Sequence, residues 1–199
     1  MDPPGMSGAR AILLCLPLLA CGGSAPSARP LTAEPISVDD RRYFEEGVDF
    51  IVDPEALEGR WALEWRQELE ARVERADVIA VVRVHTFSTQ TDLQRQVSFY
   101  LRVDEERRLL GVFPTDMALS SREGALGYAT LEGNERRILQ QRFLLFVKWD
   151  QPEGSTGVVP RWHMSPAANT VVDRVQRLVN ARLGREEAPP RTRVIVREN

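Results

Sequence analysis

The sequence predicts an α+β fold, with a small antiparallel sheet or a partly closed OB-like barrel and two flanking helices. Two stretches, at residues 54–75 and 166–183, repeat apolar residues at helical spacing. Between them, several short stretches are apolar at alternate positions or throughout, which is typical of strands. Short turns join these strands, and they favour antiparallel pairing around one core with the helices against a face or an end of the sheet.

The first helix is predicted to begin at Asp53 and Pro54. The aspartate can accept hydrogen bonds from free amides, and proline at the first helical position loses no hydrogen bond. From there to about Arg75, large apolar residues recur every four positions and form one stripe of Leu57, Trp61, Trp65, Leu69 and Val73. This spacing favours core contacts for Trp61 and Trp65 over an aromatic binding platform.

The clearest strand spans Asp77 to Ser88. One of its faces is expected to carry Val78, Ala80, Val82 and Val84. The other face is expected to carry Ile79, Val81, Arg83, His85 and Phe87. Because the first half of the strand is apolar on both faces, we expect a central position in the sheet, with an opening to solvent near Arg83.

Further strands follow along the chain. Residues 89–92 predict a hairpin loop before a strand at 96–104, and the charged residues 104–108 predict a turn before a strand at 109–113. A short strand at 127–131 and a central strand at 142–149 come next, and Pro160 favours an edge position for residues 158–164.

Ser165 and Pro166 repeat the cap-and-proline pattern and predict the start of the second helix. Apolar residues at helical spacing continue to Leu183, and Gly184 is expected to end the helix. Residues 191–197 alternate well enough for an edge strand, which either pairs with the sheet or lies loose.

Composition limits the class of protein. The chain has 199 residues, of which 43% are hydrophobic and 28% charged, and a net charge of −3. These values indicate one globular domain without the basic field that a nucleic-acid partner needs. With two cysteines, both before residue 22, and two histidines, we expect no internal disulfide and no metal site built from cysteine and histidine, while a metal site rich in carboxylates stays open.

The N-terminal residues have the pattern of an export signal. Arg10 precedes an apolar run from Ala11 to Leu19, which is too short to span a bilayer because that takes about 20 residues. The run ends in Leu18-Leu19-Ala20-Cys21, which resembles the lipobox of bacterial lipoproteins. The resemblance implies cleavage before Cys21 and lipid on its thiol. Alternatives are a signal cut near Ala20 without lipidation, or a chain that is not exported.

The lipoprotein resemblance also defines regions and location. We expect a signal peptide at 1–20, a lipidated cysteine and tether at 21–40, one domain at 41–184 and a tail at 185–199. The true start is either Met1 or Met6. Because Gly22 is not the aspartate that commonly retains lipoproteins in the inner membrane, the family pattern implies an outer-membrane anchor with the domain in the periplasm.

A second resemblance concerns the strands. Residues 76–84 (ADVIAVVRV) and 142–147 (RFLLFV) resemble the first and last barrel strands of netrin and metalloproteinase-inhibitor-like OB modules. The segment as far as Trp162-His163-Met164-Ser165-Pro166 is similar to lipoproteins of myxobacterial type, and the two resemblances cover residues 76–180. They imply a fold and not an activity, because the inhibitors act through a disulfide-bonded N-terminal cysteine whereas Cys21 is expected to carry lipid.

The sequence offers little chemistry. His163 and Ser165 lie two residues apart, but we interpret Ser165 as a helix cap, and no nucleophile elbow, phosphate loop, dinucleotide fingerprint or zinc-protease helix is present. We therefore predict no catalytic, cofactor-binding or metal-binding residues.

The function expected from the sequence is a membrane-anchored, non-catalytic binding or assembly module of the cell envelope. Its partner would be an envelope protein or polymer, and its candidate contact residues are Arg83, His85, Trp149, Trp162 and His163. The two tryptophans would otherwise plug the mouth of the barrel. The alternative function is an envelope hydrolase that uses His163 or loop carboxylates. The oligomeric state is not predicted.

Overall fold

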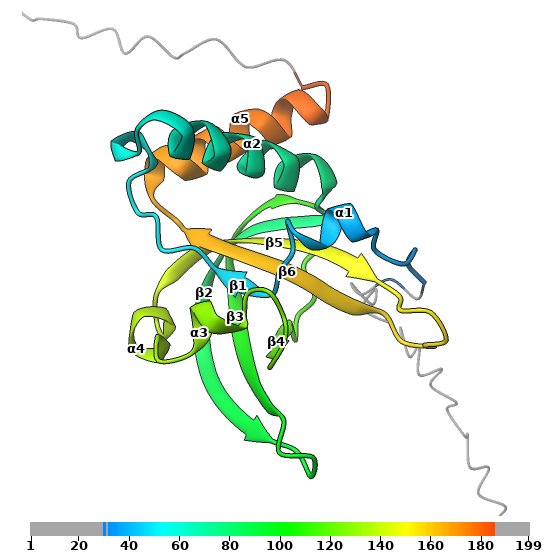
Figure 1. Cartoon of the computed structure of the whole chain (residues 1–199). Helices are drawn as coiled ribbons and strands as arrows, with labels where there is room; N and C mark the ends of the chain where they lie inside the picture. The colour runs from blue at the N-terminus through cyan, green and yellow to red at the C-terminus, as the bar shows by residue number, and fades with distance from the viewer. Residues whose placement is uncertain (1–29, 31, 186–199) are drawn as a thin grey trace, which may run out of the picture.

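The computed structural model describes residues 30 and 32–185. The predicted signal peptide, the predicted lipid-attachment residue Cys21 and the predicted strand at 191–197 lie outside the described residues. Within them the fold is α+β, with a curled six-stranded sheet and helices against its convex face (Figure 1). The predicted fold class is therefore confirmed.

The sheet has the strand order β1-β6-β5-β2-β3-β4. Neighbouring strands are antiparallel except for β1, which pairs in parallel with β6, so the sheet is mixed rather than purely antiparallel. The strands span Gly47–Val48 (β1), Val78–Thr91 (β2), Val97–Leu110 (β3), Ala118–Arg122 (β4), Arg142–Asp150 (β5) and Val159–Pro166 (β6).

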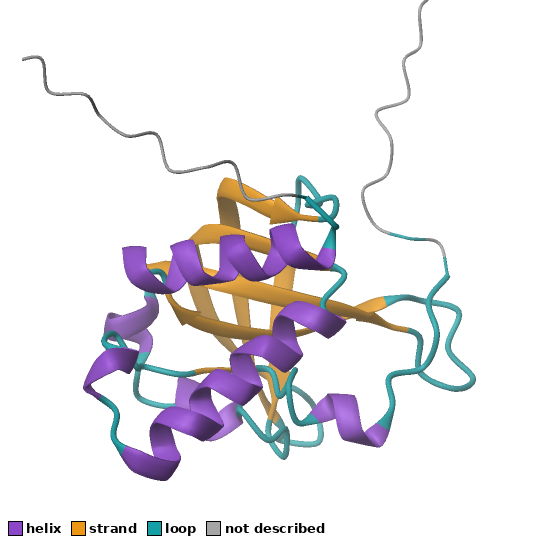
Figure 2. Cartoon of the chain, turned by 90° about the horizontal axis from the view of Figure 1, so that it is seen from above, coloured by secondary structure: helices purple, strands orange, loops and turns teal. Residues whose placement is uncertain are grey.

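Two long helices, α2 (Gly59–Arg75) and α5 (Asn169–Arg182), lie side by side over one face of the sheet (Figures 1 and 2). These are the two predicted flanking helices. The shorter helical segments of the described chain are α1 (Val38–Arg41), the 3-10 turn η1 (Pro54–Ala56), α3 (Tyr128–Leu131) and α4 (Glu135–Ile138).

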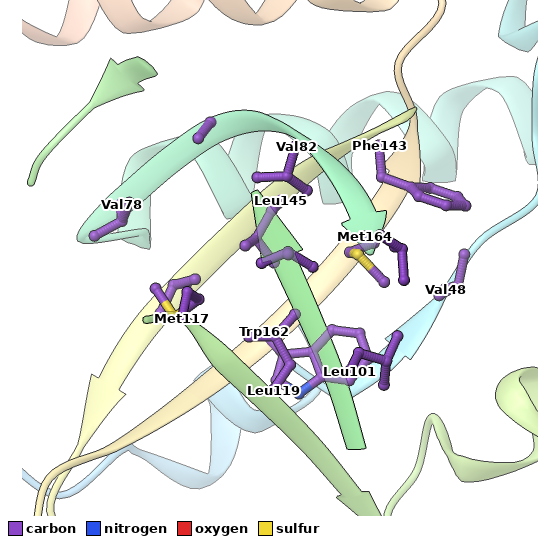
Figure 3. Packing of buried hydrophobic residues seen from close by; sticks show 14 of the residues in the cluster. Val48, Val78, Val82, Leu101, Met117, Leu119, Phe143, Leu145, Trp162 and Met164 are labelled. Atoms are coloured by element: carbon purple, nitrogen blue, oxygen red, sulfur yellow. The ribbon is translucent and has the colours of Figure 1, made fainter. Parts of the chain in front are cut away.

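The sheet separates two apolar clusters, because alternate residues of each central strand face opposite ways. Inside the curl, residues such as Val82, Leu101 and Leu145 pack around Trp162 (Figure 3). On the convex face, Ile79 and Val81 pack with residues of α2 and α5. Strand β2 is therefore covered on both faces, as its apolar first half predicts, and the predicted central position of β5 between β6 and β2 is also confirmed.

A β-bulge at His85 changes which face of the sheet the following side chains of β2 point to. The register with β3 shifts between Val84 and Thr86, so one extra residue enters the strand. Phe87 then packs against the same cluster as Val84, with its ring centroid 5.4 Å from that of Phe99. The prediction that Phe87 shares a face with Ile79 is wrong for this reason.

Strand β3 continues through the charged residues that predicted a turn. Residues 104–108 pair with β2, so the turn at 104–108 and the separate strand at 109–113 are both wrong. Cross-strand charges account for the difference, because Glu106 accepts from both Arg83 (2.7 Å) and Arg142 (2.6 Å).

Two elements between β3 and β5 differ from expectation. Strand β4 was not predicted, and residues 127–131, predicted as a strand, contain helix α3. Both elements lie where the chain carries many glycine, serine and glutamate residues, whose weak pattern does not favour one structure. Their conformation is set by contacts with β1 and β3 that are distant in sequence.

Both long helices begin later than predicted. Asp53 accepts from the amide of Glu55, but this turn is 3-10, and α2 starts at Gly59, whose φ is +57°. Ser165 and Pro166 end β6, and α5 starts at Asn169. The stripe on α2 is also shorter than expected.

Trp61 is 68% exposed, whereas Trp65, Leu69 and Val73 are buried. The core interpretation of Trp61 is therefore wrong and that of Trp65 is confirmed. The predicted end of the second helix is correct, because Gly184 follows α5 with a φ of +63°.

The segment before α1 packs onto the domain. Ile36 is buried, and its amide donates to Asp150 Oδ1 over 2.9 Å. The amide of Ala33 donates to the side chain of Gln151. Residues 32–40, predicted as part of the tether, therefore belong to the folded domain.

The open side of the curled sheet, between β1 and β4, is closed by α3. The amide of Gly127 donates to Glu45 O over 2.8 Å, and the amide of Val48 donates to Thr130 Oγ1 over 2.9 Å. The indole of Trp162 crosses the interior and donates to Ser120 O in β4 over 2.9 Å. This closure requires backbones to approach closely where a side chain would not fit.

Gly127→Ala tests this closure. A Cβ at residue 127 would lie 2.4 Å from the backbone of Gly47, so we expect a loss of about 1–3 kcal/mol in the free energy of unfolding, measured by urea denaturation. Gly157→Ala is the matched control, because a Cβ there meets nothing closer than 3.9 Å. Equal stability of the two variants would contradict the closure described above.

Candidate functional site

His163 lies at the centre of the main buried polar cluster. It is 1% exposed in β6, beside the chain segment that leads through β1. Its Nε2 lies 3.2 Å from Asp49 Oδ2, and its Nδ1 lies 3.6 Å from Glu45 Oε1 without a hydrogen-bond partner. The histidine therefore lies between two carboxylates, Glu45 just before β1 in the sequence and Asp49 just after it.

Asp49 is the hub of this cluster. Ser165 Oγ donates to Asp49 Oδ2 over 2.5 Å, and the amide of Ile51 donates to Oδ1 over 3.1 Å. Burial raises the pKa of the Asp49 carboxyl, but His163, Ser165 and the Ile51 amide outweigh it and hold that pKa below its ordinary value. The His163 ring lowers the pKa of Glu45 by more than burial raises it.

A second ion cluster fastens the same segment. Arg161 Nε donates to Asp150 Oδ2 over 2.8 Å, and its Nη1 pairs with Glu46. Burial raises the pKa of the Glu46 carboxyl above its ordinary value, against the opposing effect of Arg161. Because Asp150 also accepts from the amide of Ile36, the cluster joins the N-terminal segment, β1, β5 and β6.

The arrangement of His163 and Ser165 does not form a nucleophile with its base. In serine hydrolases the histidine lies between the serine and the acid. Here Asp49 lies between His163 and Ser165 and accepts from the serine hydroxyl. The cluster therefore binds β1 to β6 and leaves no serine that the histidine can deprotonate.

The predicted contact residues divide into two groups. Trp149, Trp162 and His163 are all at most 7% exposed, so they do not lie on the surface and the prediction of a surface role for them is corrected. Trp162 instead packs in the interior of the curled sheet, whereas its alternative interpretation placed it at the mouth of the barrel. The side chains of Arg83 and His85 are 43% and 64% exposed.

The two histidines do not come together. His163 of β6 pairs with Phe146 of β5. Arg83 of β2 pairs with Arg142, which lies four residues from Phe146 along β5. His85 lies beyond that end of β5, next to Asp104 at 4.0 Å. The sheet therefore keeps His85 and His163 apart, and they share no cleft.

Sequence reasoning missed the exposed outer part of the β2–β3 hairpin. Beyond Val84, β2 has no pairing with β5, and residues 86–91 pair only with β3. Residues 88–96 are all exposed, and Leu93 at the turn is 99% exposed (Figure 1). We define residues 86–96 as the hairpin tip. Leu93, an isolated apolar residue in a polar turn, was the available signal.

The edge of the hairpin tip lacks the usual protection of an exposed strand. From Thr86 to Thr91 it has no charged residue and no proline. Natural proteins usually place such residues on free edges, because an unprotected edge pairs with other chains. The tip is therefore suited to contact with another protein.

Neither a metal site nor a membrane-spanning helix is found in the described residues. No group of three or more His, Cys, Asp or Glu side chains among them is arranged to hold a metal ion. Likewise, no helix within residues 30–185, as far as they are described, has the length and apolar character to cross a bilayer.

Comparison with known proteins gives no relative. No protein-family model matches the chain, and no curated protein or solved structure is similar to it. The resemblances to lipoproteins and to OB modules therefore stay predictions from the sequence, and the arguments about function rest on the residues themselves.

The Asp49 cluster predicts a dependence of stability on pH. The folded-state pKa values of Glu45 and Asp49 lie below their unfolded values near 4, so their stabilisation is present at neutral pH and is lost as the pH falls through that range. Asp49→Asn should lower the free energy of unfolding by about 1–3 kcal/mol at pH 7, with a smaller difference at pH 3.

Urea denaturation followed by fluorescence between pH 3 and pH 7 measures this difference. Glu153→Gln, an exposed carboxylate in the turn before β6, is the control and should follow the unmodified protein. A constant difference between Asp49→Asn and the unmodified protein at all pH values would show that the charge of Asp49 contributes nothing.

Proposed function

We propose that this protein is a lipid-anchored, non-catalytic binding or assembly module of the cell envelope, held at the outer membrane and facing the periplasm. The observation that carries the proposal is the sequence Leu18-Leu19-Ala20-Cys21 at the end of a short apolar run. Cys21 is the residue to which the lipid is attached, and signal peptidase cleavage would leave it at the mature N-terminus.

The physical basis of the anchor is the burial of acyl chains. Each buried methylene contributes about 0.8 kcal/mol, and two or three chains hold a protein stably whereas one does not. The folded domain begins close to the anchor, because Ala33 and Ile36 already bond to the end of β5. The eleven residues between Cys21 and Ala33 span at most about 43 Å, so the domain would stay near the bilayer.

The hairpin tip supports the binding part of the proposal. Arg83 and His85, the predicted contact residues that remain exposed, lie at its base, and Leu93 lies at its turn. An envelope protein would add an extended segment to the free edge of β2 and cover Leu93. In such pairing, backbone hydrogen bonds supply affinity and the alternate side chains supply specificity.

The alternative, an envelope hydrolase that uses His163, gains no support from the geometry. A catalytic histidine must reach substrate or water, and His163 is 1% exposed. The loop carboxylates that the sequence offered, Asp104 to Glu106, lie within β3, where Glu105 and Glu106 pair with arginines.

Cys21→Ala tests the anchor. The variant should lose the lipid label and leave the membrane fraction, because no acyl chain is attached. Cell fractionation with metabolic labelling by an alkyne fatty acid measures both effects. Cys15→Ala is the control, because Cys15 lies in the predicted leader and should change neither result. A Cys21→Ala product that is still membrane-bound and labelled would refute the proposal.

Leu93→Asp tests the contact surface. In cells that carry a photo-cross-linking residue at Gln90, the variant should reduce cross-linked product at least about fivefold, because a charge placed in an apolar contact is costly. Leu126→Asp is the control, since Leu126 is also exposed, at 71%, but lies outside the hairpin tip. If both variants cross-link like the unmodified protein, or no product forms at all, the hairpin tip is not the contact surface.

A further inference from the structure

The two long helices run in the same direction, so their N-termini lie at the same end of the molecule (Figure 1). At the other end, Arg182 of α5 donates to Val73 O and Ala76 O at the end of α2, both over 2.7 Å. Neither helix has a side-chain hydrogen bond at its N-cap, which is Glu58 in α2 and Ala168 in α5. The partial positive charges of the two helix N-termini therefore add.

A pocket of about 360 Å³ lies between these two helix starts. Its apolar wall includes Leu57, Trp65 and Val171, and its polar wall includes Arg66 and Arg174. Glu55 is the acid among the lining residues. This volume lies within the range of small-molecule sites, which combine apolar walls with a few placed polar groups.

Several hydrogen-bond donors of the pocket walls have no acceptor. Trp65 is 7% exposed, and its indole N–H is buried without a partner. The amides of Thr170 and Val171, in the first turn of α5, find no acceptor among the described residues. The first-turn amides of a helix have no partner within the helix, so those of α5 can donate to an anion bound in the pocket.

The two arginines have the charge to hold such an acceptor. Arg66 bonds within its own helix to Ala62 O and has no carboxylate partner among the described residues. Arg174 pairs with Glu70 over 3.1 Å and is still 34% exposed, so it can share its guanidinium with a second anion. Arginine and helix N-termini together are a common combination for carboxylate or phosphate groups.

We propose that this pocket binds an amphiphilic anion, which is a carboxylate or phosphate headgroup joined to an apolar chain. The headgroup accepts from Arg66, Arg174 and the first-turn amides of α5, and the chain lies against Leu57, Trp65 and Val171. This site is independent of the lipid on Cys21 and of the hairpin tip.

Titration of the purified domain with decanoate, decyl phosphate and decanol tests the proposal, with tryptophan fluorescence and calorimetry as readouts. Decanoate or decyl phosphate should bind, and the tighter of the two identifies the headgroup. Decanol should bind at least about tenfold more weakly, because it lacks the charge that the arginines pair with.

Arg66→Gln and Arg174→Gln should each weaken binding of the anion about tenfold. Arg60→Gln is the matched control, because Arg60 lies on the same helix and pairs with Glu64 over 2.9 Å outside the pocket. Ala62→Phe, which places a ring in the pocket, should abolish binding, and circular dichroism checks that each variant is folded. Equal affinity for decanol and decanoate, unchanged affinity in both arginine variants, or no binding of any probe would overturn the proposal.

Discussion

The segment from Glu45 to Asp49 determines how the curled sheet is completed. Strand β1 contributes two residues to the sheet, so its ladder with β6 is too short to hold the segment by itself. Side chains supply the rest: Asp49 bonds to His163 and Ser165, and Glu46 pairs with Arg161. On the other side, the backbone of Gly47 contacts that of Gly127 and brings α3 into the gap. The interior around Trp162 is thereby closed without a full barrel.

The same constraint explains why the most chemically suggestive residues are structural. A charged carboxylate near the interior must be compensated by hydrogen bonds, and His163 and Ser165 provide them for Asp49. Once they are used in this way, they are covered by the segment that they hold. Residue types that serve catalysis elsewhere therefore stabilise a strand here, and their spacing of two along β6 reflects a shared side of the strand rather than a reaction.

The sequence predicts the parts of the fold that depend on local pattern. Helical spacing identifies α2 and α5, and unbroken apolar runs identify the central strands β2 and β5. The sequence does not reveal features that depend on distant partners. The bulge at His85 arises from pairing with β3, and the place of Ser165 depends on Asp49, which lies 116 positions away in the chain. The exposure of Trp61, one helical turn before the buried Trp65, likewise depends on what packs against α2 and not on the spacing of its apolar residues. Two predicted contact residues, Arg83 and His85, were placed correctly on the surface because their strand extends beyond β5.

The N-terminal segment and the hairpin tip lie at opposite ends of the sheet, and this arrangement bears on the proposed function. The N-terminal segment is bonded to Asp150, at the last residue of β5. The hairpin leaves the sheet at the other end of this strand, where Arg142 is level with Arg83. The N-terminal segment therefore meets the domain at one end of β5, while the free edge of β2 begins at the other. The rigid, doubly covered centre of the sheet separates the two. Under the proposed anchoring, a partner would pair with the hairpin tip at the end of the sheet away from the N-terminal segment, and a short tether would not restrict access to it.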